Sequence, residues 1–202
     1  MKNNGIVRFG DYVFRHRDIL PVPFIFIAIL ILIFTKPTFT TMHARIILFV
    51  FGGAVILLGE AIRIWAVGYS GGTTRSKKLI ADRLVKEGPY SIIRNPLYAG
   101  NFLIALGFSF TANAVSVIPI VILYFVIEYY PIVRREESFL LEKFGLEYEQ
   151  YLKEVPRFFP KGLSIKRSHY EPSALKGETW TILGIVLMFI LMIIIDLIRV
   201  RL

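Results

Sequence analysis

Five long apolar segments constrain this chain more than any other feature of its sequence. Each approaches the roughly 17–25 residues that an α-helix needs to cross the hydrocarbon core of a bilayer. Hydrophobic residues make up 55% of the chain and the mean hydropathy is +0.60, whereas a soluble domain contains about 45–50% apolar residues. The segments are 19–35, 45–67, 97–113, 115–133 and 179–198. The sequence therefore predicts an all-α, polytopic membrane helix bundle with about five transmembrane helices, although the short first and third segments are also compatible with re-entrant elements.

The amino-terminal residues and the rare residue types narrow the possibilities further. The first 18 residues are polar and basic, and no small-residue cleavage site follows segment 19–35, so we expect that segment to be a retained helix. The chain has no cysteine, which excludes disulfides, thiolate nucleophiles and cysteine metal sites. Its three histidines, His16, His43 and His169, are far apart, so we do not expect a histidine metal site.

The basic residues of the chain are unevenly distributed between the two sides of the predicted membrane. If the amino terminus is cytoplasmic, 19 of the 24 Lys and Arg residues lie on the cytoplasmic side, in the tail and in segments 70–96 and 134–177. This bias follows the positive-inside rule. The net charge of +9 therefore indicates topology and attraction to anionic lipid headgroups rather than binding of nucleic acid.

The chain is predicted to form a single membrane domain, 1–202. It divides into an amino-terminal tail with two helices (1–70), a core (71–165), and a linker with an extra carboxy-terminal transmembrane helix (166–202). Within the core, residues 136–152 show the apolar spacing of an amphipathic helix, with Gly145 as a possible bend. Pro156 and Pro160 are expected to end it.

The stretch EGPYSIIRNPLYAGNF, residues 87–102, is unusually rich in turn residues for a chain of this kind. The residue before a proline avoids the helical conformation, so a helix is expected to begin at or just after Pro96. Free N–H groups at such a helix start can bind a carboxylate or a phosphate. Two interpretations remain open: a binding site, or a simple loop-to-helix entry with Tyr90 and Tyr98 in an interfacial aromatic belt.

Four consecutive charges, Arg134-Arg135-Glu136-Glu137, follow segment 115–133. They are typical of a solvated helix end. The alternative is that one glutamate turns inward and meets a cationic ligand.

Together these two stretches resemble a known family. The pattern G-P-Y-x3-R-N-P-x-Y-x-G, an apolar hairpin, and then E-E-x2-L-x3-F-G-x2-Y-x2-Y-x4-P-R-F-x-P is similar to that of the isoprenylcysteine carboxyl methyltransferase and phospholipid methyltransferase family. The resemblance covers roughly residues 75–160. It implies an integral-membrane enzyme that uses S-adenosylmethionine in a cytoplasm-facing pocket and methylates a lipid-like or hydrophobic acceptor entering from the bilayer.

The resemblance also implies roles for individual residues. Glu136 would compensate the positive charge of the cofactor, and Glu137 would support it. Arg134 would be a further catalytic candidate. Arg75 would be a polar cofactor contact. The remaining cofactor-binding candidates are Asp82, Arg83, Leu84, Val85 and Tyr90 for the adenosine and ribose, and Asn95, Pro96, Leu97 and Tyr98 for the methionine part.

Three positions depart from the family pattern and bear on the acceptor. Members that methylate lipoproteins have His at the position of Asn95 and commonly His at that of Asp82, and the arginine that meets the substrate carboxyl in those members would fall at Ile132. An isoleucine cannot pair with a carboxylate, so both carboxyl O-methylation and headgroup N-methylation stay open. Methyl transfer from a sulfonium needs alignment and exclusion of water and requires no metal.

Polar residues inside the predicted helices suggest further contacts. Glu60 and Arg63 share one helix face and are expected to form an ion pair or to position the acceptor. Glu128 is a candidate to face the pocket, whereas Asp196 is expected to be an interfacial end residue. Gly52, Gly53 and Gly59 are expected to permit close helix packing.

Two alternatives from other classes remain. One is a membrane reductase of a related bundle fold with a nicotinamide cofactor, and the other is a non-enzymatic membrane scaffold. In a scaffold, substitution of Glu136 or Tyr98 would change stability alone.

Overall fold

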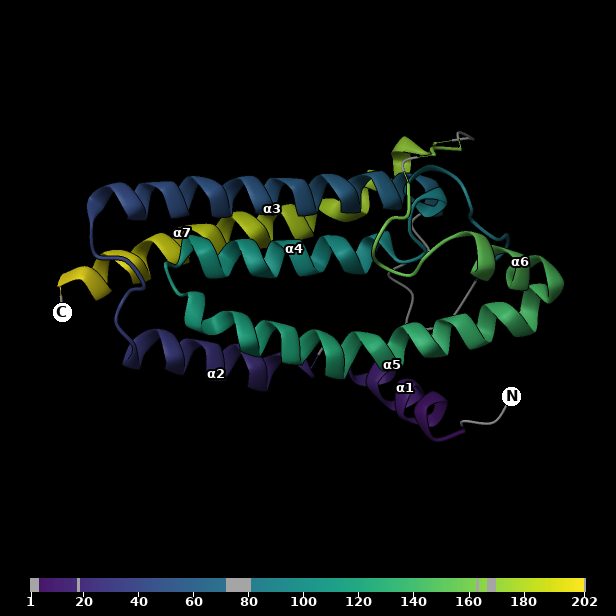
Figure 1. Cartoon of the computed structure of the whole chain (residues 1–202), viewed down its shortest axis with the longest axis horizontal. Coiled ribbons are helices and arrows are strands. Elements are labelled where there is room, and N and C mark those ends of the chain that lie inside the picture. Colours follow the sequence, from purple (N-terminus) through teal and green to yellow (C-terminus); the bar gives the residue numbers. More distant parts are fainter. Residues whose placement is uncertain (1–3, 18, 72–80, 163, 167–169, 202) are drawn as a thin grey trace.

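The computed structural model describes residues 4–17, 19–71, 81–162, 164–166 and 170–201. Within these ranges the chain is helical and contains no strand, which confirms the predicted all-α class. Long helices run side by side along one axis, and the shorter α1 (Asn4–His16) and α6 (Leu146–Glu154) lie at the same end of the bundle (Figure 1). The main helices of the bundle are α2 (Pro21–Phe34), α3 (Met42–Ser70), α4 (Pro96–Thr111), α5 (Ile118–Phe144) and α7 (Thr179–Arg201).

Three helical segments are long and apolar enough to cross a membrane, namely Met42–Ser70, Val115–Phe144 and Leu175–Arg199. The second consists of the short η3 (Val115–Val117) and α5. Helices α2 and α4 have only 14 and 16 residues. The predicted count of about five spans is thus confirmed for three helices. A fourth span requires that α2 be combined with the helix that precedes it, to which it is bent by 67°.

Two pairs of glycines allow α3 and α4 to approach each other closely. A Cβ added to Gly59 would lie 2.7 Å from the Gly100 carbonyl oxygen, and one added to Gly107 would lie 2.8 Å from the Gly52 carbonyl oxygen. Small residues permit this kind of packing between membrane helices. The prediction is confirmed for Gly52 and Gly59, whereas a Cβ at Gly53 would meet only the Phe189 ring, at 3.8 Å.

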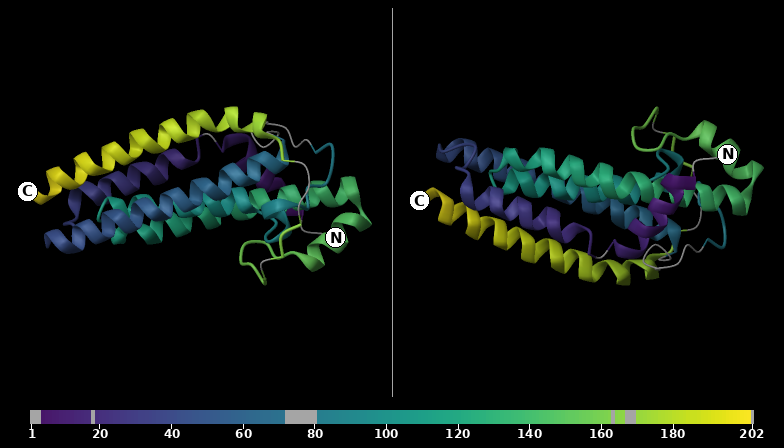
Figure 2. Two further views of the ribbon diagram at one scale, coloured as in Figure 1. Left: turned by 90° about the horizontal axis from the view of Figure 1, so that it is seen from above. Right: turned by 90° about the horizontal axis from the view of Figure 1, so that it is seen from below.

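The basic amino-terminal tail forms a helix, α1 (Asn4–His16), which the sequence analysis did not predict. It packs against α5 at the α6 end of the bundle (Figure 2). A Cβ at Gly10 would lie 2.5 Å from the Pro131 carbonyl oxygen, so a glycine is needed for this contact. Val13 and Phe14 are buried against Ile132 of α5.

The carboxy-terminal half of the core differs from the prediction in its boundaries. Helix α5 continues without interruption through Glu136 to Phe144, so the expected amphipathic helix 136–152 is not a separate element. A break at Gly145, where φ is +51°, separates α5 from α6 (Leu146–Glu154). Because this φ favours glycine, Gly145 ends one helix and starts the next in a new direction.

An ionic cluster ties α7 to the bundle at the end opposite α6. Arg45 of α3 forms a 2.6 Å ion pair with Asp196. Arg199 is buried and donates hydrogen bonds of 2.9 Å to the carbonyl oxygens of Thr35 and Ala112. Asp196 is therefore more than the interfacial end residue that the sequence suggested, because it pairs with a neighbouring helix.

Candidate functional site

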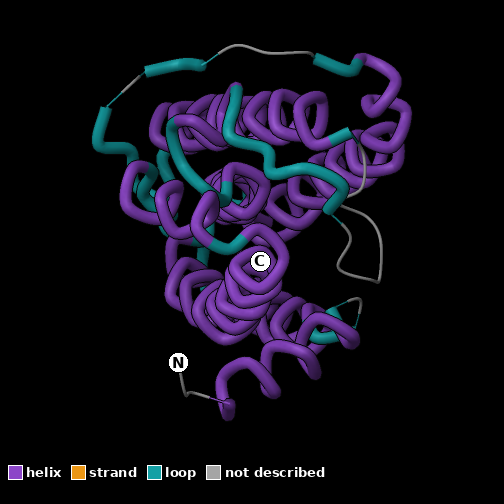
Figure 3. Tube along the Cα trace, turned by 90° about the vertical axis from the view of Figure 1, so that its right-hand side faces the viewer, coloured by secondary structure: helices purple, strands orange, loops and turns teal. Residues whose placement is uncertain are grey.

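Two adjacent cavities lie at the α6 end of the bundle. The larger, cavity A, has a volume of about 560 Å³ and is lined by residues of α3, α4 and α5 together with Arg17 and Glu178. The smaller, cavity B, has a volume of about 390 Å³ and lies between segment 81–85, the end of α5, and α6. They share five lining residues and hence one wall, formed by Arg17, Tyr90, Arg94, Asn95 and Glu136. Figure 3 views the bundle from this end.

The start of α4 is fixed by the loop that follows α6. As predicted, α4 begins at Pro96, and Asn95 precedes it with φ −126°. The Asn95 backbone and side-chain N–H groups both donate to the Arg157 carbonyl oxygen at 3.3 Å, and the Arg94 N–H donates to the Pro156 carbonyl oxygen at 2.8 Å. These bonds join the two sequence motifs, which lie about 60 residues apart, in one structural unit.

Glu137 is buried and binds two arginines. It accepts a 3.0 Å hydrogen bond from Arg94 and bonds of 2.9 and 2.6 Å from Arg157. The hydrogen bond to Glu137 raises the pKa of Arg157 above its ordinary value, so the guanidinium stays charged. Arg94 also donates to the carbonyl oxygens of Leu152 and Val155. Glu137 therefore fastens the end of α6 and the loop that follows it, residues 155–162 (the exit loop), to the start of α4.

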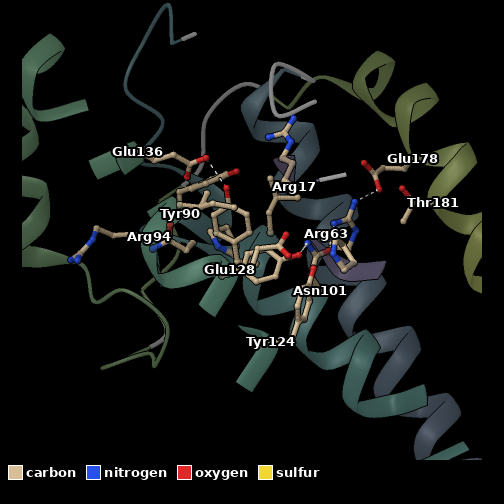
Figure 4. Close-up of a pocket in the computed structure, with 17 residues that line it drawn as sticks. Arg17, Arg63, Tyr90, Arg94, Asn101, Tyr124, Glu128, Glu136, Glu178 and Thr181 are labelled. Atoms are coloured by element: carbon tan, nitrogen blue, oxygen red, sulfur yellow. Dashed lines mark hydrogen bonds and ion pairs between the residues drawn. The ribbon is translucent and has the colours of Figure 1, made fainter. Parts of the chain in front are cut away.

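Glu136, the neighbouring glutamate, faces the shared wall instead. Its carboxylate accepts a 2.6 Å hydrogen bond from the Tyr98 hydroxyl, which fixes the direction of the side chain. The Tyr98 ring lies 4.9 Å from the Tyr129 ring, centroid to centroid. In Figure 4, Glu136 and Tyr90 lie near each other on one side of the cavity. An acidic group at the boundary of two cavities can meet a cation in either one.

The structure brings the predicted cofactor residues together in two groups. Asp82, Arg83, Leu84 and Val85 line cavity B. Pro96, Leu97 and Tyr98 line cavity A. Tyr90 and Asn95 line both, so the two groups meet at the shared wall.

Tyr90 is held in place by the short helix to which it belongs and by a hydrogen bond from α6. It belongs to η2 (Gly88–Ser91), and its carbonyl oxygen accepts a 2.7 Å hydrogen bond from the Tyr151 hydroxyl of α6. Burial raises the pKa of the Tyr90 phenol above its ordinary value, so this hydroxyl remains a proton donor at neutral pH. Burial likewise raises the pKa of the Tyr148 and Tyr151 phenols.

An ionic cluster around Arg63 forms a second side of cavity A. Arg63 pairs with Glu178 at 2.8 Å and with Glu60 at 3.4 Å, and it also donates to the Asn101 amide oxygen. The predicted pair of Glu60 and Arg63 is confirmed. Glu178 ends η4 (Pro172–Glu178), just before α7, so the carboxy-terminal segment contributes to the cavity (Figure 4).

Two candidate residues are not part of this arrangement. Arg134 is exposed and lines neither cavity A nor cavity B. Arg75 lies outside the described residues. Ile132, at the position of the family's substrate arginine, is buried and lines cavity A, and Glu128 faces the same cavity.

Several lining residues were not identified from the sequence. Arg94 belongs to the first motif and lines both cavities. Arg157 belongs to the second motif and lines neither cavity, but it binds Glu137. The spacing of the two arginines to Glu137 was the available signal. Arg17, Asn101, Tyr124 and Glu178 carry no local pattern, because the tertiary fold alone brings them to cavity A. Among the described residues, no group of three His, Cys, Asp or Glu side chains could hold a metal ion.

Comparisons with known proteins agree with the motifs. Cobalt-zinc-cadmium resistance protein CzcN of Cupriavidus metallidurans is 32% identical over 127 residues, which are 63% of this chain and 51% of that protein. Nickel-cobalt-cadmium resistance protein NccN of Alcaligenes xylosoxydans xylosoxydans is 33% identical over 52% of this chain and 46% of its own length. Protein-S-isoprenylcysteine O-methyltransferase B of Arabidopsis thaliana is 33% identical over 54% of this chain and 58% of its own length.

The chain thus spans about half the length of the curated relatives it matches. No solved structure matches it. A family model described as phospholipid methyltransferase matches residues 47–147, half of the chain, from α3 to the start of α6. The protein therefore belongs to the phospholipid methyltransferase family of membrane methyltransferases.

Proposed function

We propose that the protein is an S-adenosylmethionine-dependent methyltransferase that binds its cofactor in cavity B and a lipid-like or hydrophobic acceptor in cavity A. The observation that carries the proposal is the shared wall: two cavities meet at Tyr90, Asn95 and Glu136. A methyl donor and a methyl acceptor must touch at one point, and two cavities with a common boundary provide such a point. The names of the two resistance proteins specify no reaction, so the proposal rests on the family and on the cavities.

The residues of cavity B suit the cofactor chemically. S-adenosylmethionine supplies an electrophilic methyl group on a positively charged sulfur. Leu84 and Val85 offer apolar surface for a nucleoside, and Asp82 and Glu136 offer carboxylates for its hydroxyl and cationic groups. Tyr90 adds a phenol at the shared wall. A volume of about 390 Å³ is in the range of small-molecule sites.

The chain's own residues would act by alignment. Tyr98 holds the Glu136 carboxylate in one direction, and the bonds of Asn95 to the exit loop hold the start of α4 in place. Glu137 supports both by binding Arg94 and Arg157. Fixed groups at the boundary exclude water and keep the two reactants in line, which is the main demand of this displacement.

The acceptor would reach cavity A from the bilayer, while the cofactor enters from the cytoplasm. The family's two substrate types, a carboxyl oxygen and a headgroup nitrogen, are both compatible with the proposal. The protein would be an integral, multi-pass membrane protein of the cell inner membrane or the endoplasmic reticulum, with the cavities on the cytoplasmic side. The positive-inside bias of the Lys and Arg residues supports this orientation.

The test is transfer of a labelled methyl group. Purified protein in detergent is incubated with methyl-labelled S-adenosylmethionine and a total lipid extract of its host, and the labelled product is identified. We expect a labelled lipid or hydrophobic product with the wild-type protein and none with Glu136→Ala.

The matched control is Glu142→Ala, which changes an exposed glutamate of the same helix. Calorimetry then measures cofactor affinity for all three proteins. Undiminished affinity in folded Glu136→Ala would refute the role of Glu136. No cofactor binding to the wild-type protein would refute the proposed function itself.

A further inference from the structure

One carboxylate of cavity A takes no part in the proposed transfer step. Residues of α5 at four-residue steps line this cavity: Tyr124, Glu128, Ile132 and Glu136. Glu128 is 3% exposed, and its Oε2 atom has no hydrogen-bond partner among the described residues. The carboxylate therefore reaches the cavity wall with part of its bonding capacity unused.

Such an arrangement is costly unless something else satisfies it. A buried carboxylate loses its hydration, and an unsatisfied oxygen adds to that loss. Ionisable side chains within membrane helices are rare and mark functional sites. The structure therefore indicates a ligand group that donates to Glu128 from within cavity A.

The aromatic side chains around Glu128 indicate the charge of that group. The Tyr129 ring stacks on Phe125 at 4.4 Å and lies 5.8 Å from the Tyr124 ring, and its centroid is 4.9 Å from that of Tyr98, which also lines the cavity. Tyrosine faces attract cations, and a ring cluster beside a carboxylate is a typical site for an ammonium group.

Two cations of the protein, Arg63 and Arg17, line the same cavity. The Arg63 guanidinium is held by Glu60, Glu178 and Asn101, as Figure 4 shows for Glu178. The Arg17 guanidinium lies 4.6 Å from the centroid of the Phe14 ring and attracts the Glu128 carboxylate electrostatically. Neither residue donates a hydrogen bond to Glu128 Oε2.

We propose that Glu128, with Tyr124 and Tyr129, forms a subsite that binds a protonated amine of the acceptor. The inference rests on the proposed function, since it assigns the acceptor to cavity A. Eight residues separate Glu128 from Glu136, which is about 12 Å along a helix. The amine at Glu128 would thus anchor the acceptor, and the atom that is methylated would lie nearer the shared wall. The substrate class is a hydrophobic molecule with an amine remote from the methylated atom.

The test uses three single-chain probes of equal length: dodecylamine, which is protonated at pH 7, neutral dodecanol, and anionic dodecanoate. Binding to the protein in a non-ionic detergent is measured by calorimetry at pH 7. We expect the amine to bind the wild-type protein at least about tenfold more tightly than the alcohol, because a charge-assisted hydrogen bond is formed. Dodecanoate should bind more weakly than either.

Variants then locate the effect. Glu128→Gln should lower amine affinity about tenfold and leave alcohol affinity unchanged, whereas Glu142→Gln should behave as the wild type. Cofactor affinity of Glu128→Gln should equal that of the wild type, because Glu128 does not line cavity B; this also reports that the variant is folded.

The outcomes separate this inference from the proposed function. Equal binding of amine and alcohol by the wild-type protein overturns the subsite, whatever the variants show. An amine preference that survives Glu128→Gln also overturns it. If the wild-type protein binds no cofactor at all, the proposed function is overturned. The probe measurements still decide whether Glu128 binds an amine.

Discussion

Two neighbouring glutamates have different surroundings, although the sequence presents them as a pair. Glu136 meets the Tyr98 hydroxyl at the wall between the cavities, and Glu137 is enclosed by Arg94 and Arg157. Successive residues of a helix point about 100° apart, so adjacent side chains meet different neighbours. The resemblance implied that Glu137 supports Glu136 at the cofactor; in the structure the Glu137 carboxylate is bound by Arg94 and Arg157.

Replacement of Glu137 should therefore act mainly on stability. Glu137→Ala leaves two largely buried guanidinium groups without their carboxylate, and breaking a buried ion pair in this way costs roughly 3–5 kcal/mol. We expect a marked fall in the midpoint of thermal unfolding in detergent. Glu142→Ala, on the exposed side of the same helix, should leave the midpoint unchanged. An unaltered midpoint in Glu137→Ala would contradict the anchoring role.

Replacement of Tyr98 should act mainly on the cofactor. Tyr98→Phe keeps the ring that packs near Tyr129 but removes the hydrogen bond to Glu136. A lost hydrogen bond to a charged group costs about 1.5–3 kcal/mol, and part of this cost falls on the stability of the fold. We expect cofactor affinity to fall by up to about tenfold, because the Glu136 carboxylate is no longer held in one direction, and the midpoint of thermal unfolding to fall slightly. Tyr130→Phe, at an exposed tyrosine of α5, is the control, and equal affinity in both variants would argue against the role of Tyr98.

At the scale of elements, the contact between α3 and α4 positions residues of the larger cavity. The glycine pairs bring these helices close enough for Arg63 of α3 to bond Asn101 of α4, across the larger cavity. Any side chain at these glycines would push the two helices apart.

A single added methyl group should reveal this dependence. In Gly59→Ala the new Cβ would lie 2.7 Å from the Gly100 carbonyl oxygen, so the helices must separate at a cost of about 1–3 kcal/mol. Gly184→Ala is the matched control, because a Cβ there meets no atom within 4 Å and alanine favours the helix. Thermal unfolding in detergent should place Gly59→Ala clearly below the wild type and Gly184→Ala at or above it. The reverse order would show that close packing is unimportant here.

The helices could largely be located from hydropathy, whereas their boundaries and partners could not. Each of the five apolar segments corresponds to a helix, because the bilayer requirement for internal hydrogen bonding leaves few alternatives. Helix α1 was missed because its polar and charged residues resemble those of a tail, and its apolar residues gain a partner only when α5 is present. Helix was predicted on both sides of Glu136, but the continuity of α5 through Glu136 was missed because four charges in a row suggest a helix end.

At the scale of the whole molecule, the sequence motifs predicted Tyr90, Asn95 and Glu136 of the shared wall, but not Arg17 or Arg94, and only part of the larger cavity. Tyr90, Asn95, Tyr98 and Glu136 were all identified through the resemblance and meet as expected. Arg17 and Glu178 could not be identified, since they lie near the two ends of the chain and reach the cavity only through the packing of the bundle.

The orientation of the bundle is open to a direct test, because the chain has no cysteine of its own. Lys161→Cys and Thr40→Cys each introduce one thiol at an exposed position, at opposite ends of the bundle. In sealed inside-out vesicles, a membrane-impermeant maleimide should label Cys at 161 and spare Cys at 40, since the positive-inside rule places segment 134–177 in the cytoplasm. In right-side-out vesicles the labelling should be exchanged. The reverse result, in which Cys at 40 is labelled in inside-out vesicles and Cys at 161 in right-side-out vesicles, would exclude the proposed orientation.

The larger cavity is lined in part by four side chains from outside residues 47–147, the part of the chain that the family model matches: Arg17, Pro21, Glu178 and Thr181. Arg17 also lines cavity B, whereas Glu178 and Thr181 line cavity A alone. Exchanging the carboxy-terminal segment that starts at Glu178 between relatives should then redirect which molecule is modified while donor binding is inherited unchanged.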